Sequence, residues 1–131
     1  MIELYQFPPN FGILNPSAFC MKVEVYLKLT KTPYQVISVR NPAKGPKGKL
    51  PFIKDDNKLI GDSGIILDYL EKKLNDPLDG HLNEEQKMQA LFIKRMLEEH
   101  YYWIALYSRW VDEPGLSKTL DAFFGEKRGF I

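Results

Sequence analysis

The most informative segment of the sequence is Asn-Pro-Ser-Ala-Phe-Cys-Met-Lys-Val, residues 15–23. From Ser17 onward, apolar residues recur at the spacing of a half-buried helix that runs to Lys31. A hydroxyl therefore stands at the start of this helix, and the Cys20 thiol lies three residues inside it. The first turn of a helix offers free backbone N–H groups and the positive end of the helix dipole, so this segment predicts a place where an anion is stabilised.

Four short segments around this helix predict β-strands, because they are apolar or rich in β-branched residues. They are residues 2–7, 34–39, 50–53 and 58–60. The last two are joined by a turn at 55–57 and predict a hairpin, whereas residues 40–49, with two prolines and two glycines, predict a loop that is ordered at best. Asp62 or Ser63 then caps a helix that ends at Leu74. The order β-α-β-loop-β-β-α predicts an α/β fold in which a mixed sheet is covered by helices.

The last third of the chain has the pattern of one long helix and holds both tryptophans. Asn83 caps this helix, Gln86 completes a capping-box pattern, and the apolar spacing continues to Val111. A Pro-Gly pair then ends it, and a second, short helix is expected before the charged tail at 126–128. The expected division is a domain over 1–75, a linker over 76–82 and a helical domain over 83–131.

Composition, charge and cysteine content exclude several classes of protein. With 44% apolar and 27% charged residues among 131, the chain can hold its own core and is neither disordered nor membrane-embedded. Its net charge of +1 gives no global field to attract a nucleic acid. The single cysteine excludes an intramolecular disulfide and a cysteine-pair zinc site, so we expect no metal and a cytoplasmic location. The longest apolar run, residues 101–107, and the start of the chain predict neither a membrane span nor a signal peptide.

Three segments carry residues with both a structural and a functional interpretation. Ser17 is either a plain helix cap or a hydrogen-bond donor to a bound anion such as a thiolate. Cys20 is either a small core residue or a nucleophile, and its place on an apolar stripe favours the core. Pro51 cannot donate to a ladder, which leaves the backbone of Leu50 free to pair with a group outside the sheet. The Gly-Asp-Ser-Gly run at 61–64 is either a double helix cap or a set of hydroxyl and N–H donors for a carboxylate.

These three segments together resemble a known family. Ser-Ala-Phe-Cys-Met-Lys-Val at 17–23, Gly-Lys-Leu-Pro-Phe-Ile at 48–53 and Gly-Asp-Ser-Gly-Ile-Ile-Leu at 61–67 look like the thioredoxin-like N-terminal domain of the glutathione S-transferase superfamily. Asn-Pro-Ser-x-Phe-Cys-x-Lys-Val-Glu at 15–24 and Arg-Met-Leu-Glu-Glu-His-x-Tyr-Trp at 95–103 are most similar to its metaxin-like branch, which includes the failed-axon-connections proteins. The resemblance implies a thioredoxin-like α/β domain followed by a partial, shortened all-α C-terminal domain.

The resemblance also implies a binding site for glutathione, as a substrate. Leu50, before a cis Pro51, would pair its backbone with the cysteine amide of glutathione. Ser63, at the N-terminus of its helix, would hold the γ-glutamyl carboxylate, with Asp62 near the amino group. Lys49 is the candidate partner of the glycyl carboxylate. The side chain of Asp62 is shorter than the glutamate or glutamine common at this position in the family, which weakens its reach to the amine.

By the same resemblance, Ser17 occupies the position of the serine or cysteine that faces the substrate sulfur. Lowering a thiol pKa by ~2 units needs about 2.7 kcal/mol. One hydrogen bond to the charged sulfur contributes about 1.5–3 kcal/mol, and the helix terminus adds a few tenths to about 1. Ser17 is therefore the expected catalytic residue, activating glutathione without being a nucleophile. Because residue 17 is not a cysteine, glutaredoxin-like chemistry is not expected, although Cys20 occupies the resolving position.

Two functions follow from this resemblance. The first is a glutathione transferase that conjugates glutathione to an apolar electrophile, with Tyr101 and Trp103 as a candidate acceptor site. Aromatic residues at helical spacing are otherwise plain core. The second function is a non-catalytic adaptor or binding protein. A shortened helical domain would leave the apolar stripe of the helix over 83–111 uncovered, which predicts a homo-oligomer or a protein partner bound through that helix.

Overall fold

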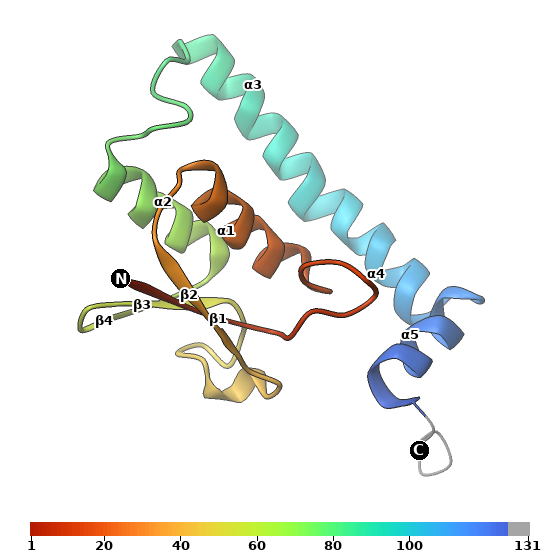
Figure 1. Ribbon diagram of the computed structural model, residues 1–131. Helices are drawn as coiled ribbons and strands as arrows, with labels where there is room; N and C mark the ends of the chain where they lie inside the picture. Colours follow the sequence, from red (N-terminus) through yellow and green to blue (C-terminus); the bar gives the residue numbers. More distant parts are fainter. Residues whose placement is uncertain (126–131) are drawn as a thin grey trace. The chain divides into compact units, whose positions relative to one another are not determined.

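The structure, a computed structural model, describes residues 1–125 and divides into two compact units (Figure 1). The first unit is Met1–Gly80, and the second begins at His81. This boundary falls within the stretch 76–82, where a linker is expected. The expected charged tail at 126–128 lies outside the described residues.

The first unit is a four-stranded mixed sheet with two helices of 12 residues each. Its elements are β1 (Ile2–Gln6), α1 (Ala18–Leu29), β2 (Tyr34–Ser38), η1 (Pro42–Lys44), β3 (Phe52–Asp55), β4 (Lys58–Gly61) and α2 (Ser63–Leu74). The strand order is β2-β1-β3-β4, in which β1 and β2 are parallel while the β1–β3 and β3–β4 pairs are antiparallel. The predicted β-α-β-loop-β-β-α order and the thioredoxin-like mixed sheet are confirmed.

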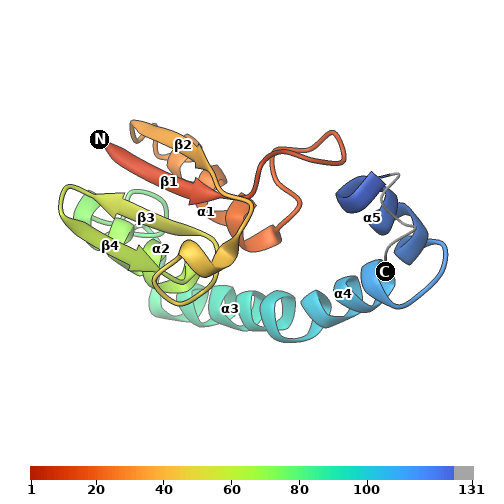
Figure 2. The same cartoon turned by 90° about the horizontal axis from the view of Figure 1, so that it is seen from below.

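Both helices lie on the same face of the sheet and share one core with it (Figure 2). α1 contributes Val23 and Leu27, and α2 contributes Ile66 and Leu70, all without exposed surface. Within each helix the two residues are four positions apart and therefore lie on one side of it. On the sheet, Ile53 of β3 is also fully buried in this core. The apolar spacing of the sequence thus decides which side of each helix meets the sheet.

A smaller cluster includes Tyr5 and Phe52, which alternate with core residues along their strands and so lie on the opposite face of the sheet. The rings of Tyr5 and Phe52 stack there, with their centroids 4.3 Å apart. Loop 40–49 folds tightly beside them, since a Cβ atom at Gly45 would lie 2.3 Å from the Lys49 carbonyl oxygen and 3.2 Å from the Phe52 ring. Only glycine fits at residue 45, and the predicted loop is ordered, with the short helix η1 within it.

Asp55, at the end of β3, is a buried carboxylate held by α2. It is 4% exposed, accepts a hydrogen bond from the Tyr69 hydroxyl (2.7 Å) and forms an ion pair with Lys73. The hydrogen bond from Lys73, followed by that from Tyr69, holds the pKa of Asp55 below its usual value. The ionised carboxylate is therefore the form that the folded unit prefers.

Replacing Asp55 by asparagine is expected to destabilise the first unit by about 1–2 kcal/mol near neutral pH, because charge-assisted hydrogen bonds are weakened. Because the folded-state pKa is depressed, this stabilisation is present above the unfolded pKa of about 4 and disappears as pH falls through the folded pKa. Urea unfolding measured over this pH range should show that the difference in free energy of unfolding between wild type and Asp55→Asn becomes smaller as the pH falls. Asp56→Asn, on the exposed turn, is the matched control, and a pH-independent difference for Asp55→Asn would contradict the assignment.

The second unit is helical in all its described elements. They are α3 (Glu84–Arg95), η2 (Met96–Tyr101), α4 (Tyr102–Trp110) and α5 (Gly115–Phe124). The predicted capping box is present, with the Asn83 Oδ1 accepting from the Gln86 N–H (2.9 Å) and the Gln86 Oε1 accepting from the Asn83 N–H (3.0 Å). The expected long helix over 83–111 is present as a continuous helical run from Glu84 to Trp110, within which η2 is a π-helical segment. The wider turns of a π-helix still keep the apolar residues on one side, so the apolar spacing of the sequence does not distinguish η2 from an α-helix.

The predicted Pro-Gly break lies where α5 begins. A Cβ atom at Gly115 would lie 1.8 Å from the carbonyl oxygen of Ser108, so only glycine allows α5 to start this close to α4. The rings of Trp110 and Phe123 stack across the two helices, with their centroids 5.7 Å apart. The short final helix is therefore packed against the one before it.

Candidate functional site

Ser17 caps the N-terminus of α1. Its Oγ accepts a hydrogen bond from the backbone N–H of Cys20 (3.4 Å), and its own N–H donates to the Oδ1 of Asn15 (3.0 Å). The residue is half-buried, so part of it remains accessible. A hydroxyl that accepts from the helix through its oxygen still has a proton to donate, so the capping role and the donor role are compatible.

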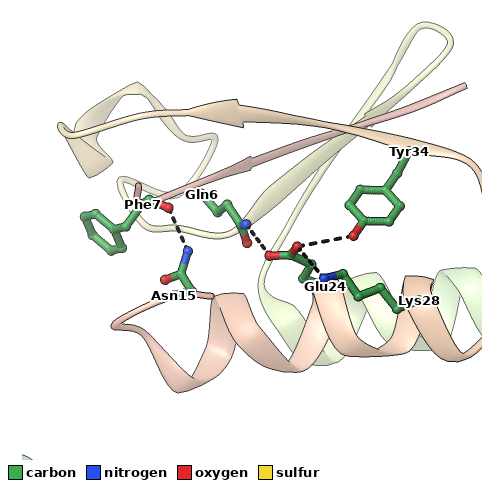
Figure 3. A network of polar contacts seen from close by, with 6 residues as sticks. All are labelled: Gln6, Phe7, Asn15, Glu24, Lys28 and Tyr34. Carbon is green, nitrogen blue, oxygen red and sulfur yellow. Dashed lines mark hydrogen bonds and ion pairs between the residues drawn. The ribbon is translucent and has the colours of Figure 1, made fainter. Parts of the chain in front are cut away.

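Asn15 ties the start of α1 to the end of β1, and the sequence alone gave no reason to assign it this role. It is fully buried, and its Nδ2 donates to the carbonyl oxygen of Phe7 (2.7 Å), as Figure 3 shows. Its Oδ1 receives the Ser17 N–H, so one side chain positions the cap relative to the sheet. An asparagine before a proline is common in loops, and this pattern does not predict which backbone groups the asparagine side chain will bind.

Cys20 lies within the first turn of α1, and its side chain is buried. It has no exposed surface and packs with Leu50 and Phe52. Burial raises the pKa of its thiol, and hydrogen bonds with Ser17 and with the Phe7 backbone offset this only in part. The thiol is therefore protonated near neutral pH, and Cys20 is better described as a core residue than as a nucleophile.

Leu50 and Pro51 precede β3 and are joined by a cis peptide bond, as the resemblance implies. The strand begins only at Phe52, and no backbone hydrogen bond between residues 1 and 125 uses the N–H or C=O of Leu50. These groups are therefore available to a peptide-like ligand that pairs as a short strand would.

Asp62, rather than Ser63, is the N-cap of α2. Its Oδ1 accepts hydrogen bonds from the N–H groups of Gly64 (2.9 Å) and Ile65 (3.4 Å). Ser63 is the first residue of the helix, 7% exposed, and its hydroxyl makes no hydrogen bond within the described part of the chain. The donors left at this terminus are thus the N–H and the hydroxyl of Ser63. Asp62 is exposed, and its second oxygen can accept from an ammonium group.

The sheet brings these segments to one end. Phe52, at the start of β3, pairs with Gly61, at the end of β4. Leu50 precedes the first of these residues by two positions and Ser63 follows the second by two, so both extend beyond the same end of the hairpin. The first turn of α1 joins them through Cys20, which shares a buried cluster with Leu50 and Phe52. Three predicted positions, Ser17, Leu50 and Ser63, therefore belong to one region.

The remaining predicted positions are more exposed. Lys49 precedes Leu50 and forms no ion pair with any of residues 1–125. Tyr101 and Trp103 belong to the second unit, and each is 61% exposed. Their role as an acceptor site stays a prediction.

A buried polar network, also without a sequence signal, joins α1 to β1 and β2 (Figure 3). Glu24 is 6% exposed and receives hydrogen bonds from the Gln6 Nε2 (2.6 Å) and the Tyr34 hydroxyl (3.2 Å). It also pairs with Lys28 (3.5 Å). In the sequence, Glu24 is a charged residue between apolar helix positions, which is typical of a solvated face.

The site consists of hydrogen-bond donors and acceptors. A hydroxyl, free strand-like backbone groups and a helix N-terminus can together bind a thiol, a peptide and a carboxylate. Across residues 1–125, no group of three His, Cys, Asp or Glu side chains is arranged to hold a metal ion. No described helix is both long and apolar enough to cross a membrane.

Comparisons with known proteins bear on the family of this chain. The glutathione S-transferase N-terminal domain family matches residues 18–115. The chain is 38% identical over 120 residues to the isoprene-epoxide glutathione S-transferase of Rhodococcus sp. (strain AD45), which covers 88% of this chain and 50% of that protein. It is 36% identical over 109 residues to Failed axon connections of Drosophila melanogaster, which covers 83% of this chain and 26% of that protein.

A solved structure shares the fold. The crystal structure of a diazinon-metabolizing glutathione S-transferase of the silkworm, Bombyx mori, matches with a TM-score of 0.66 at 19% identity, covering 91% of this chain and 62% of that one. The chain spans about half the length of the Rhodococcus relative and about a quarter of the Drosophila one. Since the family match covers most of the chain, including α1, the Leu50–Pro51 segment and α2, the chain belongs to the glutathione S-transferase N-terminal domain family.

Proposed function

We propose that the first unit binds glutathione and that Ser17 activates the thiol of the bound tripeptide. The observation that carries this proposal is the set of unused donors and acceptors at one end of the sheet, the backbone of Leu50 and the N–H and hydroxyl of Ser63. The tripeptide's cysteine pairs with Leu50, and its γ-glutamyl carboxylate binds at Ser63. Membership in the glutathione S-transferase family supports the same ligand.

Two charged side chains extend the proposed site to the ends of the ligand. The free oxygen of Asp62 accepts from the γ-glutamyl ammonium group, and Lys49 pairs with the glycyl carboxylate. Both side chains are exposed, and an exposed ion pair contributes only about 0–1 kcal/mol. Most of the affinity therefore comes from Leu50 and from the nearly buried Ser63.

The chemistry rests on the hydroxyl of Ser17. This hydroxyl hydrogen-bonds to the buried thiol of Cys20, which is a weak acceptor. It therefore forms a stronger hydrogen bond when it turns to a ligand thiolate. A charge-assisted bond of about 1.5–3 kcal/mol lowers the pKa of the ligand thiol by about 1–2 units. The thiolate sulfur then attacks an apolar electrophile. With an epoxide, the class named for the Rhodococcus relative, a C–S bond forms, a C–O bond breaks and the alkoxide takes a proton from water.

Replacing Ser63 by alanine is expected to weaken glutathione binding about tenfold, because the carboxylate loses a nearly buried donor. Calorimetric titration measures this change, and Ser38→Ala, at an exposed position of β2, is the matched control. Wild-type protein that gives no heat with millimolar glutathione would reject the binding site. Equal affinities of wild type and Ser63→Ala would reject the role of Ser63.

Replacing Ser17 by alanine is expected to leave glutathione affinity within about twofold but to lower the ultraviolet absorbance of the bound thiolate. Ser17→Thr keeps a capping hydroxyl and should retain the signal. S-Methylglutathione has no ionisable thiol and should bind wild type and Ser17→Ala alike. Unchanged thiolate absorbance in Ser17→Ala would reject activation by Ser17 without rejecting the binding site.

A second candidate function, a non-catalytic binding protein, is favoured by the surface of the second unit. Large apolar side chains of α3, η2 and α4 are exposed, among them Leu91, Phe92, Met96, Tyr101, Trp103 and Tyr107. An exposed apolar face of this extent fits an interface with a protein partner or with a second copy of the chain. Light scattering tests the second copy, since a monomer at micromolar concentration would contradict self-association. Conjugation of an epoxide by such a monomer would favour the enzyme.

A further inference from the structure

β2 is an end strand of the sheet, and its outer edge carries none of the usual protection. The order β2-β1-β3-β4 gives it a neighbouring strand on one side only (Figure 2). Exposed edges are commonly blocked by a charged residue or a proline within the strand, and the sequence of β2, Tyr-Gln-Val-Ile-Ser, has neither. The other end strand, β4, is one residue shorter and begins with Lys58. Of the two edges, that of β2 is therefore the better template for another strand.

Three residues of β2 direct their backbone groups outward. The N–H of Val39 donates to the carbonyl oxygen of Gln6 (2.8 Å). Because the backbone groups of successive residues point to opposite sides of a strand, this bond shows which residues of β2 point toward β1. The N–H and C=O groups of Tyr34, Val36 and Ser38 therefore point away from β1. No backbone hydrogen bond outside the β1–β2 pair uses these three residues within the described part of the chain. Val36, at the centre, has a side chain that is 38% exposed.

Cations without partners stand at both ends of this edge. From residue 25 to residue 54 the chain has seven lysines and arginines and no acidic residue. Lys28 and Lys54 pair with glutamates, whereas the other five cations form no ion pair with described residues. These five exposed residues are Lys31, before β2, and Arg40, Lys44, Lys47 and Lys49, after it.

Loop 40–49 holds four of these cations on an ordered backbone. The N–H of Gly45 donates to the carbonyl oxygen of Pro42, and the N–H of Gly48 donates to that of Gly45, each at 2.9 Å. The close approach of Gly45 to Lys49 closes the loop on itself. Because this backbone is ordered before any partner arrives, binding costs it little conformational entropy.

We infer that the outer edge of β2 is a docking site for an extended acidic segment of another protein, which adds to the sheet as a fifth strand. The main chain of that segment pairs with Tyr34, Val36 and Ser38, and its carboxylates meet Lys31 at one end and loop 40–49 at the other. The five unpaired cations beside the edge give the charge complementarity that selects an acidic partner.

Other occupants fit this edge less well. Antiparallel pairing of β2 with β2 of a second copy would bring Lys31 of each chain near Arg40 of the other, and like charges facing across a strand pair are destabilising. A lipid surface is also a poorer partner, because loop 40–49 has no large apolar side chain to insert.

Fluorescence anisotropy of the full chain with a synthetic peptide tests the inference. The probe alternates valine and threonine and carries two glutamates at each end, and it is expected to bind less tightly at about 1 M salt, where the Debye length is about 3 Å. Val36→Pro should weaken binding about tenfold or more, because proline removes an outward N–H and leaves the bonds to β1 intact. Arg40→Glu combined with Lys44→Glu should have a similar effect. Lys58→Glu, on the other edge, is the matched control and should leave binding unchanged.

A second peptide and an exchange measurement separate strand addition from simple charge attraction. A peptide of the same charge with proline at alternate positions cannot form a ladder and is expected not to bind. In the wild type, the amide protons of Val36 and Ser38 should become protected from exchange when the first peptide binds, which tests the inference even where Val36→Pro does not fold. Equal binding of both peptides, binding of anionic vesicles with the same affinity, or no binding at millimolar peptide would overturn the inference.

Discussion

Replacing Glu24 by alanine is expected to destabilise the first unit by about 2–4 kcal/mol. The substitution removes the acceptor of the Gln6 amide, which is 1% exposed and therefore largely shielded from solvent. A buried donor left without a partner costs about 1–3 kcal/mol, and the Tyr34 hydroxyl loses its acceptor as well. The ion pair with Lys28 adds little, because that ammonium group is 46% exposed and such pairs contribute about 0–1 kcal/mol.

Amide hydrogen exchange of the β1 protons is the suitable measurement for this variant. Both tryptophans, Trp103 and Trp110, belong to the second unit, so their fluorescence does not report directly on the sheet. Lys28→Ala removes only the exposed ion pair and should lower the free energy of unfolding by less than about 1 kcal/mol. Glu24→Gln keeps an acceptor oxygen for Gln6 and should fall between the two. Equal losses for Glu24→Ala and Lys28→Ala would contradict the buried network.

Replacing Ile53 by alanine is expected to cost the first unit about 2–5 kcal/mol, the range for removing a large side chain from a packed core. Ile53 has no exposed surface and lies on β3, which pairs with both β1 and β4. Its side chain is in the core that α1 and α2 share with the sheet. The cavity would therefore lie between three elements, none of which can close it without moving away from the others.

Urea unfolding followed by far-ultraviolet circular dichroism and by β1 amide exchange measures this loss. Leu59→Ala, on the neighbouring strand β4, is the matched control, because Leu59 is 59% exposed and should lose well under about 1 kcal/mol. Ile53→Val removes one methylene group and should cost about 0.5–1.5 kcal/mol. Similar losses for Ile53→Ala and Leu59→Ala would contradict the placement of the core.

Much of the fold was predictable because local patterns and tertiary packing agree. The half-buried spacing after Ser17 predicts a helix to Lys31, and α1 spans Ala18–Leu29 with Val23 and Leu27 facing the sheet. The ends differ by a residue or two, because caps and turns rather than periodicity set where a helix begins and ends. The π-helical segment η2 was not predictable, since it preserves the apolar spacing that was the only signal.

The candidate site was predictable in its positions and not in its connections. Ser17, Leu50 and Ser63 were singled out because helix starts and a strand-opening proline leave backbone groups unused. At α2, Asp62 caps the helix and leaves the donors of Ser63 unused. Either residue could have adopted the backbone conformation of an N-cap, so the sequence does not decide between them. Asn15 was missed because a loop asparagine has many possible partners, and only the end of β1 decides among them.

The order of elements, the apolar sides of α1 and α2 and the family of the chain follow from the amino-acid sequence, because each of these depends on residues close together in the chain or on a short motif. Three features became visible only in the folded chain: Glu24 is a buried acceptor for Gln6, Cys20 is buried in one cluster with Leu50, and the outward edge of β2 lies between unpaired cations. The physical reason is that burial, hydrogen-bond partnership and strand position depend on residues far apart in the chain. These three properties are established only when the sheet forms, so a local sequence pattern does not predict them.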